Sequence, residues 1–447
     1  MINGKNEPIM LPCSAPIGIL LSNFFKMSQY FNTFVLTRGF LIALLGSLFI
    51  YLDAWGISSP ALNTVCGITT LYFLLKEEQK VWFWAGFFIG IFWFWWISLS
   101  FKHYGMIWAI PLSILIVSLI YGLLFWSIAF IANKITAMPP VYYPILSLAI
   151  KAFGLLGLSY IHPFGFDWLK PELMFTNSYL GIQKWQFAFI VLSLMLTIAK
   201  KHPAYLFFIL FSYQPDNHLS HHIPSDIQIT HTQVHVGDKW KETLHPRQFK
   251  AFFTLIDEAI HAKKSLIILP ESVFPVFLNH SPDLLEELKK RAQKINIVTG
   301  ALYWDGKVPH NSAYIFTKNG VQIANKVLLV PFGESNPLPD FLSNWVNEVF
   351  YDGAVDYQAS KEMTDYIIQN NTYRNAICFE ATSEKLYEGN PKQMIVLSNN
   401  GWFVPSIEPS LQKILLQYYS KKYGTTIYHS VNMSNAYMVK EGRVTEI

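Results

Sequence analysis

Charged residues are scarce in this chain. Asp, Glu, Lys and Arg make up 14% of the 447 residues, whereas 52% are hydrophobic and the mean hydropathy is +0.26. This composition is too apolar for an ordinary soluble globular protein and indicates segments that lie within a membrane. The formal net charge is only +4, and the lysines are scattered along the chain. Because nucleic acids are bound by concentrated basic surfaces, we expect no nucleic acid partner.

Cysteine is also scarce. Only Cys13, Cys66 and Cys378 are present, and they form neither a CxxC motif nor a recognisable disulfide framework. The histidine-containing stretch at residues 218–236 has no spacing typical of metal ligands, and the second half of the chain has no glycine-rich phosphate loop. We therefore expect no metal and no cofactor.

Long apolar runs are concentrated in the first half of the chain. A transmembrane helix needs about 20 predominantly apolar residues, and some of the runs are shorter than this. We predict about seven transmembrane helices, at residues 33–52, 60–75, 81–101, 107–132, 141–160, 183–199 and 203–213. The expected organisation is an N-terminal extension without an assigned structure (1–30), a transmembrane domain (31–213), a linker (214–225) and an outer domain (226–447).

Basic residues alternate between the loops that join these runs. The loops at 76–80, 133–134 and 199–202 carry lysines, whereas the loop at 53–59 has no basic residue. Cytoplasmic loops of membrane proteins carry the excess of Lys and Arg. With about seven spans, the N-terminus is then expected in the cytoplasm, and the chain beyond about residue 213 is expected outside it.

The outer domain has the pattern of an α/β protein, in which short apolar strands alternate with amphipathic helices. A hairpin is indicated by Asn319 and Gly320, which form a turn between two strand-like runs. We predict strands at 227–236, 265–272, 295–304, 376–380 and 393–400, helices at 246–264, 281–294 and 408–424, and hairpins at 312–330 and 427–447. This order favours an α/β sandwich.

One stretch near the C-terminus allows two interpretations. The helix at 408–424 carries apolar residues at helical spacing, and the segment 402–407 before it is also apolar. The two could form a flap that dips into the membrane, or the helix could pack in an ordinary core. The apolar positions are Leu411, Ile414, Leu415, Tyr418 and Tyr419.

Three polar residues stand at strand ends or inside apolar strands, namely Glu271, Lys326 and Cys378. Taken singly, they have ordinary explanations: a carboxylate in a turn, a charge at a sheet edge and a small buried hydrophobic residue. Together they suit acyl transfer. A carboxylate can take the proton of a thiol nucleophile, and a lysine ammonium favours the thiolate and stabilises a developing oxyanion.

The chain resembles the nitrilase superfamily at these residues. That superfamily carries a Glu-Lys-Cys triad in this order on an αββα sandwich, and LPES (269–272), NKVLLVPFGES (325–335) and ICFE (377–380) are similar to its three motifs. The intervals of 55 and 52 residues also suit it. The resemblance implies that Glu271 is the general base, Lys326 the oxyanion-stabilising cation and Cys378 the nucleophile.

The apolar runs ahead of this domain make the whole chain similar to the apolipoprotein N-acyltransferases. The similarity includes the motifs at 239–240, 331–335, 398–403 and 429–439. It implies supporting roles for Glu334 and Glu380 and substrate contacts by Trp240, Phe379 and Trp402. Phe379 stands where the family often has a hydroxylated aromatic residue, and the family commonly has one more membrane span after this domain, so we expect the outer domain to be tethered at one end only.

The same resemblance implies a multi-pass protein of the bacterial inner membrane with its catalytic domain on the periplasmic side. It further implies a ping-pong reaction in which a phospholipid, with phosphatidylethanolamine as the expected donor, acylates Cys378, and a diacylglyceryl apolipoprotein accepts the acyl chain. A monomer is expected. Two alternatives stay open: a membrane-tethered amidase or nitrilase acting on a small C–N substrate, and a non-catalytic transporter or scaffold with a degenerate outer domain.

Overall fold

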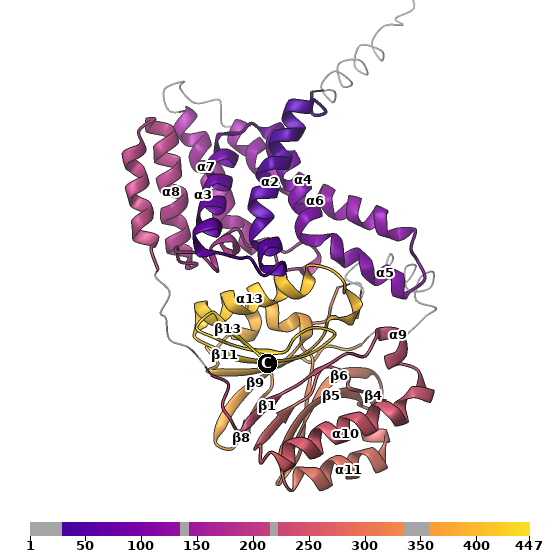
Figure 1. The fold of residues 1–447 in the computed structure, drawn as a ribbon. Helices are drawn as coiled ribbons and strands as arrows, with labels where there is room; N and C mark the ends of the chain where they lie inside the picture. Colours follow the sequence, from indigo (N-terminus) through magenta and orange to yellow (C-terminus); the bar gives the residue numbers. More distant parts are fainter. Residues whose placement is uncertain (1–28, 135–142, 215–221, 332, 335–356) are drawn as a thin grey trace, which may run out of the picture.

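The computed structural model describes residues 29–134, 143–214, 222–331, 333–334 and 357–447. A helical bundle lies at one end of the molecule and an α/β sandwich at the other, with helix α13 between them (Figure 1). Most of the N-terminal extension expected at 1–30, together with Cys13, lies outside the described residues, as does part of the linker expected at 214–225.

Each of the seven predicted apolar runs forms a helical element over the residues that the structure describes. Close packing between these helices depends on glycine, because a Cβ at Gly39 would lie 2.5 Å from Trp84 Cβ, and a Cβ at Gly86 would lie 2.4 Å from the carbonyl oxygen of Tyr121. The elements are α2 (Thr33–Ala54), α3 (Pro60–Lys76), α4 (Gln79–Phe94), η1 (Trp95–Leu99), α5 (Ser100–His103), α6 (Ala109–Lys134), α7 (Tyr143–Gly157), α8 (Lys184–Lys200) and η6 (Pro203–Ser212).

Three of the described helices are long and apolar enough to cross a membrane by length and composition. They cover Thr33–Ala54, Gln79–His103 and Ala109–Lys134. The other apolar elements are shorter, so the count of about seven spans stays a prediction.

The segment between α7 and α8 forms three short helical turns, and the last of them packs against α13. They are η3 (Leu158–Tyr160), η4 (Pro163–Gly165) and η5 (Pro171–Phe175). The hydroxyl of Tyr419 donates to Asp167 Oδ2 at 3.1 Å, and the hydroxyl of Tyr418 donates to Glu172 Oε1 at 3.2 Å. All four side chains are buried, so this segment joins the bundle to the sandwich through a satisfied polar network.

Two sheets face one another in the second half, which confirms the predicted αββα sandwich (Figure 1). Apolar residues of both sheets form the core between them, including Ile268 from one sheet and Leu397 from the other. The first sheet has the order β1 (Ile227–Ile229), β3 (Leu266–Ile268), β5 (Asn296–Trp304), β6 (Pro309–Thr317), β7 (Gly320–Asn325), with β4 (Phe274–Phe277) beside β5. The second has the order β13 (Arg443–Glu446), β12 (Tyr437–Lys440), β11 (Thr426–Asn432), β10 (Gln393–Asn399), β9 (Asn371–Ile377), β8 (Asp365–Ile368), with β2 (His231–Thr232) beside β11.

Helices cover the outer faces of both sheets. α10 (His245–His261) and α11 (Pro282–Ala292) cover the first sheet, and α13 (Glu408–Tyr423) covers the second. The remaining short elements are α9 (Val236–Lys239), η7 (Glu242–Leu244), η8 (Leu278–His280), η9 (Cys378–Thr382), η10 (Glu384–Tyr387) and η11 (Asn400–Trp402).

The single strand predicted at 227–236 is wrong in one respect, because the chain changes sheets within it. β1 pairs with β3 of the first sheet, whereas β2 pairs with β11 of the second. Thr230 stands at the crossing, where its backbone N–H donates to the carbonyl oxygen of Ile268 at 3.0 Å. Period-two alternation cannot reveal such a crossing, because both short strands keep the same pattern.

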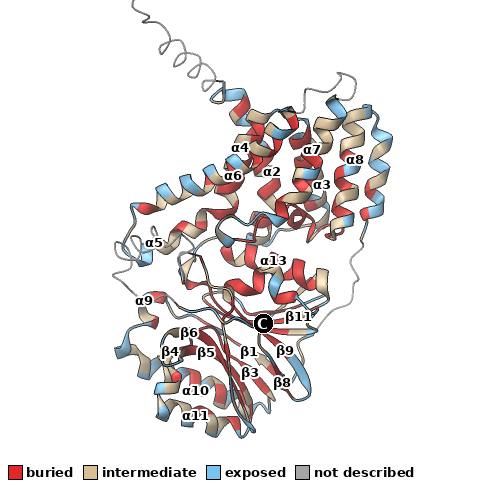
Figure 2. Cartoon of the chain, turned by 180° about the vertical axis from the view of Figure 1, so that it is seen from behind, coloured by how far each residue is buried: buried red, intermediate tan, exposed pale blue. Residues whose placement is uncertain are grey.

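The apolar face of α13 is buried rather than free to enter a membrane. Its apolar residues belong to a core cluster that also contains residues of the bundle (Figure 2). Core packing is therefore the correct interpretation for this helix, and the membrane flap is wrong for it. The five apolar positions named in the sequence analysis are each at most 1% exposed: Leu411, Ile414, Leu415, Tyr418 and Tyr419.

Candidate active site

Glu271, Lys326 and Cys378 come from three different strands and meet at one cavity. Glu271 lies three residues after β3, Lys326 directly after β7 and Cys378 directly after β9. β3 and β7 belong to the first sheet and β9 to the second, so the cavity lies where the ends of the two sheets come together. This cavity is polar and has a volume of ≈ 330 Å³, and all three side chains line it.

The Glu271 side chain is buried and held from several sides. Its Oε1 accepts a hydrogen bond from Asn311 Nδ2 at 2.8 Å, and its backbone carbonyl accepts one from Lys239 Nζ at 3.0 Å. The turn at Glu271 and Ser272 lies so close to β5 that a Cβ at Gly300 would be 2.3 Å from the Ser272 nitrogen. The position of this carboxylate is therefore fixed by the backbone as well as by hydrogen bonds.

Lys326 is a fully buried cation between two carboxylates. Its Nζ lies 2.7 Å from Glu334 Oε2 and 3.9 Å from Glu271 Oε1. Burial alone would lower the pKa of Lys326, but the charges of Glu334, Glu271 and Cys378 outweigh it and raise the pKa above its usual value. The ammonium is therefore charged at neutral pH.

Cys378 is half-buried and adopts a left-handed backbone conformation, with φ of 55°. Such a conformation costs a non-glycine residue about 1 kcal/mol and is typical of functional sites. Desolvation by the surrounding protein raises the pKa of the thiol well above its usual value, and the Glu271 carboxylate raises it further, whereas Lys326 lowers it. A neutral thiol of this kind needs a base before it can act as a nucleophile.

Asn311 links the two carboxylates and could not be identified from the sequence. Its Nδ2 donates to Glu271 Oε1 at 2.8 Å and to Glu334 Oε1 at 2.9 Å, while its Oδ1 has no hydrogen-bond partner among the described residues. The sequence gives only a weak indication of its role, namely a polar residue in a buried strand. Glu334 itself lies in the cavity, where the resemblance placed it.

Glu380 lies behind the cavity and does not line it. The residue is 1% exposed, and its carboxylate accepts hydrogen bonds from the backbone N–H groups of Val327 (2.7 Å), Leu328 (3.1 Å) and Ile377 (2.7 Å). These groups follow Lys326 and precede Cys378 in the chain. Glu380 therefore connects the segment that carries Lys326 with the segment that carries Cys378. Burial raises the pKa of the Glu380 carboxyl to about 7.

The three aromatic residues implied by the resemblance occupy two different places. Trp240, 41% exposed, and Trp402 line the polar cavity, and the ring of Trp402 stacks on Tyr104 with 6.1 Å between centroids. Phe379 is buried, and its ring packs 5.1 Å from that of Phe166. It does not line the polar cavity but lines a second one.

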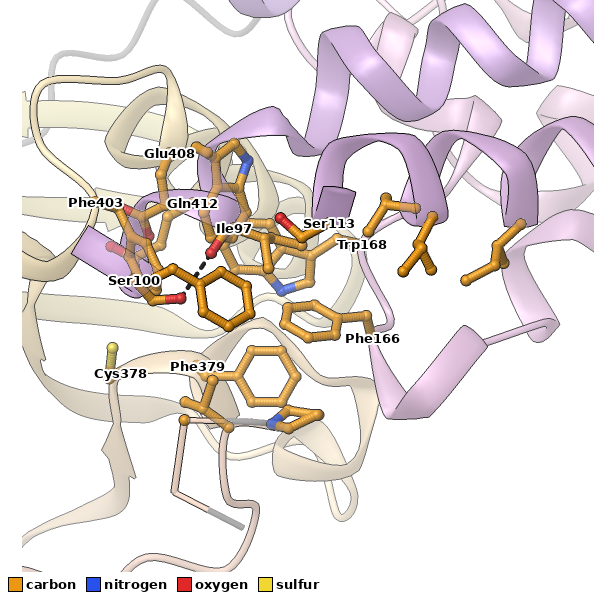
Figure 3. A pocket seen from close by; sticks show the side chains of 18 of the residues that line it. Ile97, Ser100, Ser113, Phe166, Trp168, Cys378, Phe379, Phe403, Glu408 and Gln412 are labelled. Atoms are coloured by element: carbon orange, nitrogen blue, oxygen red, sulfur yellow. Dashed lines mark hydrogen bonds between the residues drawn. The ribbon is translucent and has the colours of Figure 1, made fainter. Parts of the chain in front are cut away.

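This second cavity is apolar, has a volume of ≈ 350 Å³ and shares Cys378 with the first. Figure 3 shows Cys378 at the edge of this cavity. The rings of Phe379, Phe166 and Phe403 also line the cavity. Its walls come from both halves of the chain, because η1, α5 and α6 contribute residues opposite those of the sandwich. The sulfur atom thus lies where a polar and an apolar chamber meet.

Comparison with known proteins identifies the family. The family model described as the apolipoprotein N-acyltransferase integral membrane domain matches residues 32–215. The apolipoprotein N-acyltransferase of Wolinella succinogenes is 40% identical over 88% of this chain and 92% of its own length. That of Helicobacter pylori is 31% identical over 89% of this chain and 92% of its own.

Among solved structures, a CN-hydrolase superfamily protein from Xanthomonas campestris aligns with 49% of this chain and 85% of its own, at 14% identity and a TM-score of 0.38. The sequence identity to the relatives from Wolinella and Helicobacter extends over both halves of the chain, and it therefore establishes the family. This chain belongs to the apolipoprotein N-acyltransferase family.

Proposed function

We propose that this chain is a phospholipid:apolipoprotein N-acyltransferase that works through a thioester on Cys378. It moves an acyl chain from a phospholipid, with phosphatidylethanolamine as the donor, to the α-amino group of the diacylglyceryl-cysteine of an apolipoprotein. The membrane domain corresponds to 31–213, and the catalytic domain, joined by a linker at 214–225, to 226–447. The observation that carries this proposal is the position of Cys378 between the chamber of Glu271 and Lys326 and the apolar chamber.

The first step is attack of the Cys378 sulfur on the ester carbonyl of the donor. Glu271 takes the thiol proton as the carbon–sulfur bond forms, which is needed because the thiol is neutral at rest. The oxyanion of the tetrahedral intermediate is stabilised by the Lys326 ammonium. When the intermediate collapses, the carbon–oxygen bond breaks, the lysophospholipid oxygen takes the proton from Glu271, and the thioester remains.

The second step is attack of the acceptor amine on this thioester. Glu271, again a carboxylate, takes a proton from the attacking amine, and Lys326 stabilises the second oxyanion. The carbon–sulfur bond then breaks, an amide is formed, and the proton returns from Glu271 to the Cys378 sulfur. The chain ends the cycle as it began, so no cofactor is needed.

The apolar chamber explains why this triad is attached to a membrane domain. Moving an acyl chain from the bilayer into water would cost about 0.8 kcal/mol for each CH₂ group. Side chains of η1, α5 and α6 line the chamber beside Cys378, so an acyl chain can stay in apolar surroundings while its carbonyl carbon reaches the sulfur. An amidase for a small C–N substrate would have no use for such a chamber, and a scaffold would have no use for the triad.

The arrangement of the bundle supports a periplasmic catalytic domain in the inner membrane. At one end of α2, Arg38 forms an ion pair with Glu77 of the basic loop at 76–80. At the other end, Asp53 Oδ2 lies 3.1 Å from Lys413 Nζ of α13 in the sandwich. The sandwich and the basic loop are therefore at opposite ends, and the positive-inside rule assigns the loop to the cytoplasm. We also propose a monomer as the functional unit, since Glu271, Lys326 and Cys378 of a single chain meet at the cavity without a residue from a partner.

The decisive experiment compares the N-terminal cysteine of one lipoprotein from cells with and without this chain. Mass spectrometry should find three acyl chains when the chain is present and two when it is absent or when Cys378 is replaced by alanine. An unchanged mass in all three samples would return the amidase and the scaffold to consideration.

A further inference from the structure

Glu408 is a buried carboxyl group in the wall of the apolar chamber. It is the first residue of α13 and is 2% exposed. It lines the same chamber as Cys378, and its Oε2 has no hydrogen-bond partner among the described residues. A buried polar atom without a partner costs about 1–3 kcal/mol, so this one calls for an explanation. The mechanism above does not use it.

Three polar side chains of the chamber wall, those of Gln412, Ser100 and Ser113, have partners of their own. Gln412 lies one helical turn further along α13, also lines the chamber, and accepts a hydrogen bond from Asn400 Nδ2 at 3.3 Å. The hydroxyls of Ser100 and Ser113 donate to carbonyl oxygens of their own helical segments, at 2.8 and 3.0 Å. Figure 3 shows Glu408, Gln412 and Ser100 grouped at one side of the chamber. Of Glu408, Gln412, Ser100 and Ser113, only Glu408 has a buried side-chain oxygen without a hydrogen-bond partner among the described residues.

The protonation state of Glu408 indicates what it can bind. Burial raises the pKa of Glu408 to about 8, so at neutral pH the group is mainly a carboxylic acid with an O–H to donate. A neutral donor in apolar surroundings suits a neutral acceptor such as an ester carbonyl oxygen. A cationic head group fits less well, because it would bring a charge and its hydration water into an apolar wall.

Both substrates of the proposed reaction carry such an acceptor. A diacyl phospholipid has two neighbouring fatty esters on one glycerol, and only one of them is attacked. The other carbonyl enters the same apolar surroundings and loses its hydrogen bonds to water. The diacylglyceryl group of the acceptor also has two such esters, so one donor near Cys378 could serve both substrates in turn.

We propose that Glu408, with Gln412 beside it, binds the carbonyl oxygen of the ester that is not attacked and so selects lipids with two neighbouring ester groups. This inference rests on the proposed function and adds a substrate-recognition residue to it. The selection follows from the hydrogen bond: a lipid with a single ester leaves the Glu408 acid unpaired, whereas a diacyl lipid satisfies it.

The test uses the purified full chain in detergent and two donors with the same head group, diacyl phosphatidylethanolamine and its monoacyl lysolipid. The rate of thioester formation on Cys378 is followed by intact-protein mass. Glu408→Leu should slow the reaction with the diacyl donor about tenfold, the value of one buried hydrogen bond, and leave the monoacyl donor unchanged. Glu408→Gln, whose amide still donates, should keep most of the diacyl preference. Glu258→Leu, which removes an exposed carboxylate on α10, is the matched control.

The ratio of the two rates is measured within one protein sample, so partial misfolding does not change it. An equal loss with both donors, or no loss with either, would overturn the inference. A loss that appears with phosphatidylethanolamine but not with diacyl phosphatidylglycerol would also overturn it, since Glu408 would then bind the head group. If the unmodified chain forms no thioester with any donor, the proposed function itself fails.

Discussion

Asn311 donates a hydrogen bond of 2.8 Å to Glu271, and the same amide nitrogen reaches Glu334 at 2.9 Å. Both carboxylates also lie within 4 Å of the single ammonium of Lys326. Two acceptors facing one cation would repel each other, and the shared amide donor holds both side chains in place. In the proposed mechanism, this arrangement positions Glu271 to accept the proton of Cys378.

Asn311→Leu should therefore lower acyl transfer without unfolding the sandwich. A hydrogen bond to a charged group contributes about 1.5–3 kcal/mol, so we expect a loss of about 10- to 100-fold in kcat with a small change in KM. The measurement is steady-state transfer to a diacylated lipopeptide.

The neighbouring Ser312→Ala is the control for Asn311→Leu. Its hydroxyl donates to Asn325 Oδ1 at 2.7 Å on the other face of the same strand, outside both chambers. Normal activity of Asn311→Leu would show that Glu271 needs no such support.

Replacing Cys378, the proposed nucleophile, separates an effect on the chemistry from an effect on folding. With donor and no acceptor, the unmodified chain should gain the mass of one acyl chain, and hydroxylamine should remove it. Cys378→Ser should form no such adduct, because a hydroxyl has a far higher pKa than a thiol. Lys326→Met should lose the oxyanion stabilisation, about 3 kcal/mol or roughly 100-fold in rate. Cys66→Ser and Cys13→Ser should stay active, and an adduct that survives in Cys378→Ala would contradict the mechanism.

That Glu271, Lys326 and Cys378 lie together could be predicted because the signal is local. Glu271, Lys326 and Cys378 each stand at a strand end, where strand periodicity fixes their place, and their order and motifs resemble a known superfamily. Asn311 gives no such signal, because a polar residue in a strand is ordinarily taken for one on a solvent-facing side. Glu408 likewise looks like an acid favoured in the first turn of a helix, and only the packed structure shows that it is buried.

The contacts between the helical bundle and the sandwich could not be predicted from the sequence either. The segment 158–183 was expected to be partly a span and partly a connection, yet Asp167 and Glu172 bind tyrosines of α13 more than 240 residues away. Hydrophobic periodicity reports which face of a helix is buried and not what covers it. This is why the same apolar stripe on α13 allowed both a membrane flap and a core.

Glu380 should make stability depend on pH. Its pKa is raised to about 7 in the folded chain from a model-compound value of 4.5, because it is buried. Between these two values the unfolded chain binds fewer protons than the folded one, so stability falls as pH rises, by at most about 3 kcal/mol.

Glu380→Gln lacks this titration. It should be less stable than the unmodified chain at every pH, because its amide has one acceptor oxygen in place of the two that bind three backbone N–H groups, but the gap in melting temperature should narrow from pH 5 to pH 8. The exposed Glu388→Gln serves as the control. A gap that is constant with pH would show that Glu380 is ionised throughout.

Topology can be tested by reporter fusions. Alkaline phosphatase, which is active only outside the cytoplasm, should be active when fused after residue 213 and inactive when placed in the loop at 76–80. The ends of α2 give the physical reason, since Arg38 pairs with that loop and Asp53 with the sandwich. The reverse pattern of activity would place the catalytic domain in the cytoplasm, away from exported lipoproteins.

Gly300 restricts the position of Glu271, the proposed general base, through contact with the backbone alone. A Cβ at this position of β5 would lie 2.3 Å from the Ser272 nitrogen and 2.7 Å from Glu271 Cα. Backbone atoms cannot rotate away as a flexible side chain can, so Gly300→Ala must push the turn that carries Glu271 outward. A displacement of about 1 Å in a reacting group can cost on the order of 100-fold in rate.

Thioester formation by Gly300→Ala should fall by about that factor, while the melting temperature falls only by a few degrees. Gly157→Ala, where a Cβ would meet nothing within 4 Å, should change neither quantity. Full activity of Gly300→Ala would mean that Glu271 does not need this position, and its role as the base would then have to pass to another group of the cavity.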